Sequence, residues 1–378
     1  MTEKTTPGFI DAHSHLRSTS LESQGVVPCV NLEEALLRFT AMTGVNAFDD
    51  AFVASADLVK AGVTGVQVFF HTFAGKDEYL ATLADAVGGI SKSGIRALVI
   101  LGITDQAEFI TKELEHSGLL PPWLPPKQNL TAEQYADIFV EAKKLFPEVT
   151  FGLGPIAGQW CSDKLLGQIQ ELAEDKTRIH SHLLESPRQR NWVGENPLLR
   201  LDRHGLLGPK TSLAHGVWSE SDDLNLIRDR GSQLVTCPGS NRALGAGKAD
   251  LGMWQKHNVE FGFGLDSAAA DITPLKIATE AMGRDLAERT LTEGGVACTD
   301  LSVESDRVSW SDYESGITED VVIGEKTLVV GGKLTYAAEY ESALGRIQQT
   351  MLSDSANRED RQRLLDDLMP AYQRALGE

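Results

Sequence analysis

The sequence predicts an α/β fold, a (β/α)8 barrel followed by a smaller C-terminal appendage, and three observations support this. The chain has 378 residues, more than the roughly 250 that such a barrel requires. Segments of strand composition alternate with segments of helical periodicity, as in parallel sheets, whose neighbouring strands need crossover connections. There are eight such strands, enough to close a barrel, at residues 9–14, 63–70, 95–102, 149–154, 178–183, 211–215, 233–237 and 259–266.

Two of these strands have the composition expected inside a barrel. In VTFGLG (149–154) and VEFGFGLD (259–266), large apolar residues alternate with glycines. One face of each strand can therefore pack on helices while the other face leaves room inside.

The segments between the strands carry helix signals. TAEQ at 131–134 is a capping-box pattern, and Ser162 is a predicted N-cap. Ser162 precedes an apolar stripe with helical spacing, formed by Leu165, Leu166, Ile169, Leu172 and Ala173. The proline-rich segment 119–128, which carries Trp123, is either a lid over the barrel mouth or a rigid surface connection.

Beyond the eighth strand the pattern changes, so we divide the chain into a barrel domain at 1–300 and an appendage at 301–378. DVVIGEKTLVVGGKLT at 320–335 predicts a β-hairpin. The charged, periodic segment 341–378 predicts one or two surface helices.

Composition limits the partners of the chain. It has 54 acidic against 35 basic residues and a formal net charge of −19. Such a surface repels phosphate backbones and anionic lipid, so we expect neither nucleic acid nor a membrane as a partner. The four cysteines form no CxxC pair, and no apolar run reaches the ~18 residues of a membrane span. We therefore expect a cytoplasmic protein.

Histidines gather at the carboxyl ends of the predicted strands, where barrel enzymes place their catalytic groups. Five of the nine histidines lie there: His13, His15, His180, His182 and His215. The first two are two residues apart on one strand, so their imidazoles point the same way and can share one metal ion. The alternative is a pair of hydrogen-bonded polar residues at a strand end.

The fifth strand ends in His180-Ser181-His182 and is followed by Glu185. His182 can complete a three-histidine set; His180 faces the same side and is the rival ligand, but His182 lies nearer the barrel mouth. Glu185 could take a proton from metal-bound water and return it to a leaving group. Alternatively, Glu185 is a carboxylate stabilised at a helix N-terminus.

Three further strands end in polar residues. Asp266, after the eighth strand, can bind the metal and accept a proton, or it can cap the next helix. His215, after the sixth strand, could polarise the bond under attack or hold the water. His71, after the second strand, is interpreted as structural.

The order of these residues resembles the amidohydrolase superfamily, in particular its cytosine deaminase and atrazine chlorohydrolase-like branch. The resemblance runs from residue 7 to about 290. Seven motifs carry it: PGFIDAHSHL (7–16), GVTGVQ (62–67), CSDKLLGQIQELA (161–173), HSHLLES (180–186), LAHGVW (213–218), CPGSNRALGAGKA (237–249) and GLDSAAAD (264–271).

The resemblance implies a barrel enzyme with one divalent ion, zinc in preference to iron. It implies that Glu185 is the acid/base residue, that His215 activates substrate and water, and that the ion is held by His13, His15, His182 and Asp266. Relatives with two metals use a lysine on the fourth strand, and the absence of lysine from VTFGLG favours a mononuclear site.

Two departures from the family pattern matter. Many nucleoside deaminases of this branch carry a histidine after the strand-four proline. This chain reads PIAGQW at 155–160, which argues against nucleoside substrates.

Relatives also carry β-sandwich strands before the barrel. Here the barrel opens at residue 8, so the hairpin 320–335 should lack its usual partners. An isolated hairpin is marginal in water, so it must pack on the barrel, on the C-terminal helices or on another subunit. We expect a homodimer in which 320–335 contributes to the interface or packs under the C-terminal helix.

The function that these features predict is hydrolytic deamination of an N-heterocyclic small molecule by metal-activated water. Gln159 and Trp160 could hydrogen-bond and stack on a flat ring, and Arg17 could bind an anionic or carbonyl group. Asn241 is expected to shape the barrel mouth. The alternatives are ring-opening amide hydrolysis or dechlorination at the same site, or a catalytically silent barrel that serves as a binding module.

Overall fold

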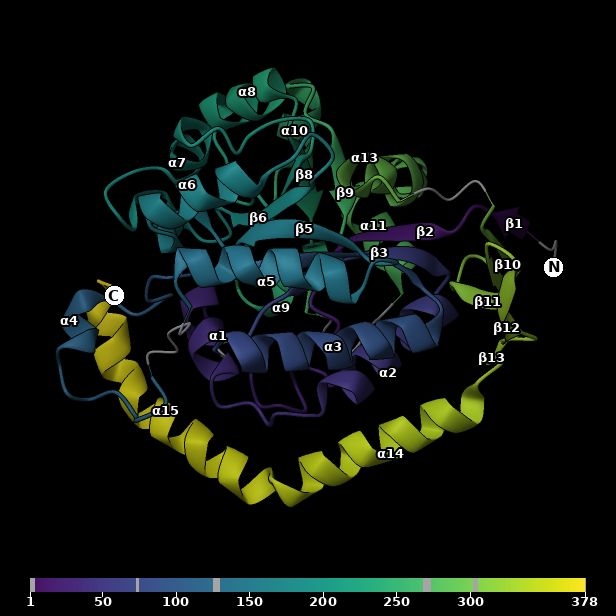
Figure 1. Cartoon of the computed structure of the whole chain (residues 1–378), viewed down its shortest axis with the longest axis horizontal. Coiled ribbons are helices and arrows are strands. Elements are labelled where there is room, and N and C mark those ends of the chain that lie inside the picture. Colours follow the sequence, from purple (N-terminus) through teal and green to yellow (C-terminus); the bar gives the residue numbers. More distant parts are fainter. Residues whose placement is uncertain (1–3, 73–74, 125–129, 268–272, 302–304, 378) are drawn as a thin grey trace.

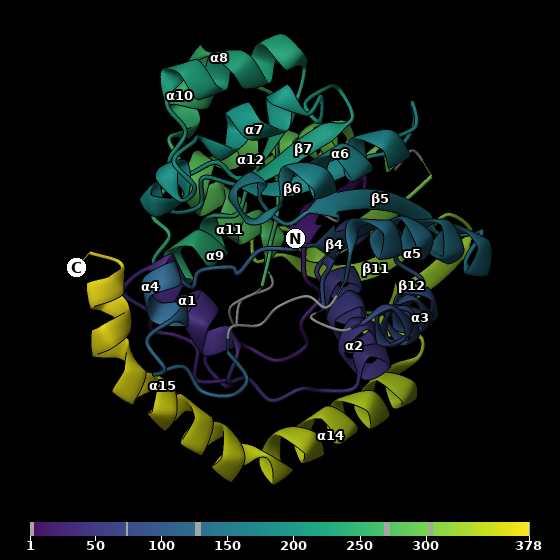
Figure 2. The same cartoon turned by 60° about the vertical axis from the view of Figure 1, so that its left-hand side comes forward.

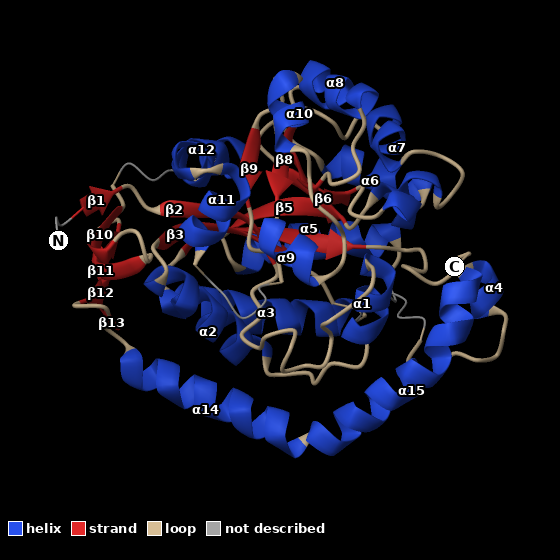
Figure 3. Cartoon of the chain, turned by 180° about the vertical axis from the view of Figure 1, so that it is seen from behind, coloured by secondary structure: helices blue, strands red, loops and turns tan. Residues whose placement is uncertain are grey.

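All eight predicted barrel strands form in the computed structural model, which describes residues 4–72, 75–124, 130–267, 273–301 and 305–377. They pair in parallel and in sequence order, so that each strand lies beside the next one along the chain. Helices lie on both sides of these strands (Figure 3). The strands are β2 (Phe9–Ser14), β3 (Val63–Phe70), β4 (Arg96–Ile103), β5 (Thr150–Pro155), β6 (Ile179–Leu183), β7 (Thr211–His215), β8 (Gln233–Thr236) and β9 (Phe261–Phe263).

The barrel closes between its first and last strands at their carboxyl ends. Ser14 and Asp266 form an isolated parallel bridge. The Asp266 N–H donates to the His13 carbonyl at 2.7 Å, and the His15 N–H donates to the Asp266 carbonyl at 3.3 Å. Closure therefore brings the HxH segment beside Asp266.

The helices of the barrel begin where the sequence predicts. Thr131 and Gln134 form the reciprocal capping box of α5, and the Ser162 side chain accepts from Leu165 N at the start of α6. No described helix is long and apolar enough to cross a membrane. The helices are α1 (Leu32–Phe39), α2 (Ala47–Lys60), α3 (Lys76–Ser93), α4 (Lys112–Glu115), α5 (Ala132–Leu145), α6 (Asp163–Leu172), α7 (Pro197–Arg203), α8 (Ser221–Arg230), α9 (Pro238–Ala243), α10 (Leu251–Lys256), α11 (Pro274–Met282), α12 (Arg284–Arg289) and α13 (Gly295–Thr299).

The predicted hairpin is present, but the expectation that it lacks partners is wrong. It is part of a five-stranded antiparallel sheet in the order β1-β10-β11-β12-β13. A short N-terminal strand, which the sequence did not predict, supplies one edge. The strands are β1 (Lys4–Thr6), β10 (Arg307–Asp312), β11 (Ile317–Ile323), β12 (Lys326–Val330) and β13 (Lys333–Leu334).

This sheet packs on its own barrel. Val321 and Val329 of the hairpin are fully buried. The ring of Trp310 on β10 lies 5.3 Å from that of Phe9 on β2, and the Thr318 hydroxyl donates to the Lys60 carbonyl at 2.8 Å. The prediction of a homodimer rests on a hairpin without its usual partners, and the packing within the chain removes that reason. The homodimer itself stays a prediction.

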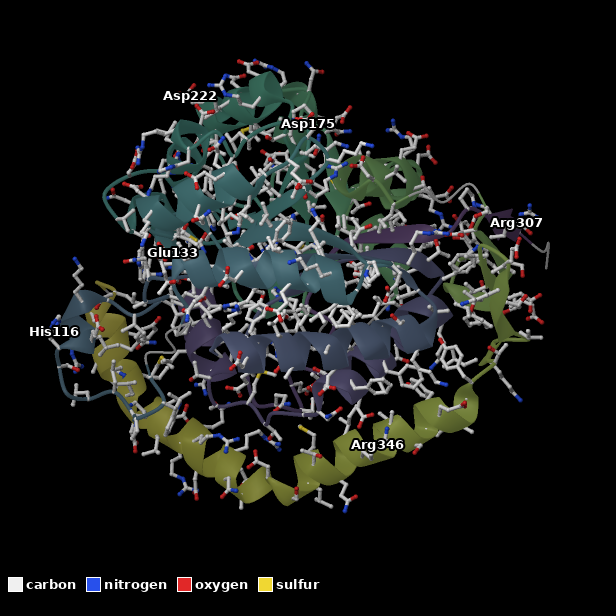
Figure 4. All side chains as sticks on the ribbon, in the orientation of Figure 1. His116, Glu133, Asp175, Asp222, Arg307 and Arg346 are labelled. Carbon is white, nitrogen blue, oxygen red and sulfur yellow. The ribbon has the colours of Figure 1, made fainter. Side chains whose placement is uncertain are left out.

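Two long helices follow the sheet, α14 (Ala337–Ser353) and α15 (Ser355–Ala375). They meet at an angle and run along one side of the barrel, from the sheet to the region of α1 and α4 (Figures 1 and 2). Arg346 of α14 forms two hydrogen bonds with the Asp49 carboxylate on α2 (Figure 4). The prediction of one or two C-terminal helices is confirmed as two.

Candidate metal centre

Side chains from four barrel strands converge at one point near the carboxyl ends. Their ligand atoms lie within 4.8 Å of one another in three overlapping groups, which are His13, His15 and Asp266; His13, His182 and His215; and Glu185, His215 and Asp266. The structure thus brings together all six residues for which the sequence predicted metal-binding or catalytic roles.

The side-chain nitrogens and the carboxylate oxygen of the cluster lie close together and face a common centre. His13 Nε2 and His15 Nε2 each lie 3.4 Å from Asp266 Oδ1. His182 Nε2 lies 3.3 Å from His15 Nε2. His13 Nε2 is buried and has no hydrogen-bond partner among the described residues.

The partners of two imidazoles fix their tautomers. His15 Nδ1 lies 3.1 Å from the Phe69 carbonyl, and His182 Nδ1 lies 2.8 Å from the Ile156 carbonyl. A carbonyl only accepts, so both Nδ1 atoms carry protons. Burial lowers the pKa of His15 to about 3 and the pKa of His182 well below its ordinary value, so both rings are neutral near pH 7.

A neutral imidazole protonated at Nδ1 has an unprotonated Nε2. His15 and His182 therefore direct two nitrogen lone pairs at each other across 3.3 Å, and neither can donate a hydrogen bond. Such an arrangement is repulsive unless a cation lies between the lone pairs. The side chains present thus fit a metal ion that prefers nitrogen and carboxylate ligands.

Asp266 supplies negative charge to the cluster. Burial by itself would raise the pKa of this carboxyl, but the neighbouring imidazoles of His13, His215 and His15 outweigh burial and hold it well below its ordinary value. The Ser240 hydroxyl donates to Oδ2, which leaves Oδ1 directed at the imidazoles. Three neutral nitrogens and one carboxylate are a common ligand set for zinc.

His180, the rival ligand in the sequence, points elsewhere. Its Nε2 lies 2.8 Å from His13 Nδ1, and its Nδ1 lies 2.7 Å from the Ser212 hydroxyl. Both ring nitrogens are therefore used in hydrogen bonds. The structure places His180 behind His13, where it orients that imidazole.

Glu185 and His215 lie beside the cluster. Glu185 Oε2 is 3.6 Å from His215 Nε2, and burial raises the pKa of the Glu185 carboxyl to about 7. His215 Nδ1 lies 2.9 Å from Asn241 Oδ1, so Asn241 contacts a residue of the cluster. A carboxyl with a pKa near neutrality can gain and lose a proton at physiological pH.

A cavity of about 860 Å³ opens onto these residues. Arg17 and Trp160, predicted to bind substrate, line it, whereas Gln159 and Asn241 are not among its lining residues. Trp123, from the segment considered as a lid, also lines the cavity, although 125–129 lie outside the described residues. His71, interpreted as structural from the sequence, is a cavity residue as well.

Two carboxylates in this region were missed in the sequence. Glu33 is buried and accepts from the Ser186 hydroxyl, next to Glu185. Glu108 is buried and lines the cavity. Glu108 follows the carboxyl end of β4, and that position was the only local signal for it.

Comparison with known proteins agrees with this geometry. The sequence profile described as the amidohydrolase family matches residues 5–316. The chain belongs to the amidohydrolase family. That family is metal-dependent, and the imidazole and carboxylate cluster of this amidohydrolase is where its fold would hold the ion.

Curated relatives of this amidohydrolase are deaminases. The 5-methylthioadenosine/S-adenosylhomocysteine deaminase 2 of Archaeoglobus fulgidus is 28% identical over 335 residues, which cover 85% of this chain and 74% of that protein. The 5′-deoxyadenosine deaminase of Methanobrevibacter smithii is 26% identical over 276 residues, which cover 70% of this chain and 57% of that protein. The chain therefore spans well under the full length of both.

Solved structures share the fold. An adenosine deaminase from Xanthomonas campestris with bound zinc aligns with a TM-score of 0.74 at 20% identity, covering 92% of this chain and 86% of that one. An atrazine chlorohydrolase from Arthrobacter aurescens complexed with zinc aligns with a TM-score of 0.75 at 17% identity, covering 92% and 88%.

Proposed function

We propose that this amidohydrolase is a zinc-dependent enzyme that hydrolytically deaminates a small N-heterocycle. The observation that carries the proposal is the pair of unprotonated Nε2 atoms of His15 and His182, 3.3 Å apart, beside the ionised Asp266. The ion would be held by His13, His15, His182 and Asp266. When bound there, zinc supplies Lewis acidity, which makes water nucleophilic near neutral pH.

Glu185 is the proposed proton carrier. Its carboxyl is buried and directed at His215, and its pKa of about 7 is that of a group that can exist in both protonation states at neutral pH. A nearby cation would lower this pKa and favour the carboxylate, which can take the proton from the attacking water. The same group then delivers that proton to the departing amine nitrogen.

His215 is the proposed partner of the reacting carbon. Its Nε2 faces Glu185 and has no hydrogen-bond partner among the described residues, while Asn241 holds its Nδ1. A φ of 73° places this non-glycine residue in the left-handed region, a strained conformation that functional sites often retain. From there the imidazole can hydrogen-bond the ring nitrogen next to the carbon under attack.

The cavity supports a flat substrate with a polar substituent. Trp160 offers an indole face, and Arg17 lies among the cavity residues with its guanidinium 5.6 Å from the Phe39 ring. We assign Trp160 to stacking and Arg17 to an anionic or carbonyl substituent. The relatives named above are deaminases of adenosine derivatives by name. Many nucleoside deaminases of this branch carry a histidine after the strand-four proline, where this chain has Ile156, so we propose a different heterocycle.

The test is product analysis with the zinc-loaded protein on a panel of pterins, purines, pyrimidines and triazines. Stoichiometric ammonia with replacement of the amino group by oxygen is the expected result. Release of chloride, or of a ring-opened acid without ammonia, would show that the same site performs dechlorination or amide hydrolysis. If the protein carries its full complement of metal and turns over no compound of the panel, the result would favour a binding module.

A further inference from the structure

Glu108 is a buried carboxyl that the reaction described above does not use. It lies between β4 and α4, lines the cavity and is only 4% exposed. Its Oε1 has no hydrogen-bond partner among the described residues; the closest recorded group, His71 Nε2, lies 3.8 Å away. Burial raises the pKa of Glu108 to about 8. A buried carboxyl oxygen without a hydrogen bond costs free energy, so its presence beside a cavity points to a hydrogen bond supplied by the ligand.

Two indoles line the same cavity as Glu108. Trp123 and Trp160 both line it, and the Nε1 atom of each is buried without a hydrogen-bond partner among the described residues. Indole faces stack on flat rings, and indole N–H groups donate to acceptors. This wall therefore combines stacking surfaces with one carboxyl that can accept and, when neutral, also donate.

The backbone next to Glu108 is strained and braced. Phe109 has a φ of 43°, a left-handed conformation that costs free energy for an aromatic residue. Its carbonyl accepts a 2.7 Å hydrogen bond from the Tyr372 hydroxyl of α15. Tyr372 is fully buried and lies beyond the family match, so the C-terminal helix of this chain holds the cavity loop in place.

We propose that Glu108 recognises an N–C–NH2 edge of the substrate, so that the enzyme acts on N-heterocycles with a second, retained amino group. This inference rests on the proposed function. A neutral carboxyl fits that edge with two hydrogen bonds: its O–H donates to the ring nitrogen, and its carbonyl oxygen accepts from the amino group. If the heterocycle is basic enough to take the proton, the same two contacts persist as a charged pair.

Other ligand groups fit this wall poorly. An anionic substituent would face a carboxyl, and the cavity already offers Arg17 for negative charge. A purely apolar edge would leave the Glu108 oxygens unsatisfied. A carbonyl edge could accept from a neutral Glu108 but would offer nothing to its second oxygen.

The experiment measures binding, so that it does not depend on turnover. The zinc-loaded Glu185→Gln protein is titrated by calorimetry with 2-aminopurine and with purine, which differ only in the amino group, so that purine has no N–C–NH2 edge. We expect 2-aminopurine to bind about 10- to 100-fold more tightly, the range for a hydrogen-bonded pair with a buried carboxyl. Adding Glu108→Leu should bring this ratio close to one. Adding Glu108→Gln, which keeps an acceptor and a donor, should retain most of it.

The control is Glu78→Gln, which removes an exposed carboxylate of α3 and should leave the ratio unchanged. An affinity ratio near one in the protein with Glu108 intact overturns the inference, and this outcome does not depend on whether the Glu108 variants fold. A high affinity ratio that persists in the Glu108→Leu variant also overturns it. Ammonia release by the wild-type enzyme is measured separately. If ammonia is released but the affinity ratio is near one, only the role of Glu108 is refuted. If the affinity ratio is high but no ammonia is released, only the proposed deaminase activity is refuted.

Discussion

At the scale of the residue, His180 and His182 lie two positions apart on β6 and have the same side chain, but their hydrogen-bond partners give them different roles. His180 uses both ring nitrogens in hydrogen bonds, to His13 and Ser212. His182 uses only Nδ1 on the protein backbone and directs Nε2 at His15. The strand periodicity indicated that both point inward, but only the surrounding side chains separate a ligand from its support.

Glu185→Gln tests whether this residue carries protons. The amide keeps the size of the side chain but cannot accept and release a proton, so turnover should fall by ~10²-fold or more. Metal content should stay unchanged because Glu185 is not among the proposed ligands. Ammonia release and elemental analysis of the same preparation measure both. Turnover within a few-fold of wild type would show that Asp266 or another base carries the proton.

Glu108 should make stability depend on pH. Its folded pKa of about 8 lies above the ordinary 4.5, so the unfolded chain loses this proton first as pH rises. The stability that it contributes is therefore full below about 4.5 and is lost as pH rises toward 8. Glu108→Gln should raise the urea midpoint at pH 8 relative to wild type, and the difference should shrink toward pH 5. The same difference in urea midpoint at pH 8 and pH 5 would contradict the conclusion that Glu108 is buried as a neutral carboxyl.

The sequence predicted the metal cluster better than the cavity. His13, His15, His182 and Asp266 lie at or just after strand ends, and strand ends of a barrel meet at one face whatever the side chains between them. Glu108 and Glu33 are different, because segments far apart in the sequence meet there: the Tyr372 hydroxyl of α15 donates to the carbonyls of Phe109 and Glu33. No local pattern in the sequence reports such a long-range contact.

At the scale of the element, local signals sufficed for the barrel and failed for the second sheet. Strand–helix alternation placed all eight barrel strands within a few residues. β1 was missed because three residues, Lys4–Thr6, have no periodicity of their own. β10 was missed although its buried Val308 and Trp310 alternate with more exposed residues. The pairing of these two strands joins the N-terminal strand to the segment after the barrel, with Lys4 opposite Trp310, and only tertiary packing reveals it.

Tyr372→Phe tests the brace between α15 and the cavity loop. The substitution removes the hydroxyl that bonds Phe109 and Glu33, so stability should fall by about 1 kcal/mol and KM should rise several-fold. Tyr340→Phe is the matched control, since its hydroxyl bonds Asp57 away from the cavity loop. It should lower stability by a similar amount and leave KM unchanged. Equal KM values for the two variants would show that α15 does not support the cavity.

At the scale of the whole molecule, the C-terminal segment belongs to the folded body of the chain. α14 and α15 extend from the second sheet to α1 and α4 (Figures 1 and 2). Their inner faces bury Tyr340, Ala343, Ile347, Leu365 and Tyr372. The hairpin 320–335 thus packs within its own chain, and the homodimer stays a prediction.

Deleting residues 336–378 should give a protein that aggregates or expresses poorly, because the apolar surface under both helices would face water. Soluble yield and size-exclusion chromatography measure this. Leu352→Ala is the control, since Leu352 is 76% exposed and its loss should leave yield unchanged. A soluble, active deletion variant would show that the two helices are dispensable.

Metal content tests the central claim most directly. Elemental analysis of the purified chain should find about one zinc ion per chain, and His182→Ala should lose most of it, because three ligands hold zinc less firmly than four. His204→Ala, which removes a histidine that pairs with Asp163 outside the cluster, should retain the wild-type content. Two ions per chain, or full zinc in His182→Ala, would contradict the single site built by His13, His15, His182 and Asp266.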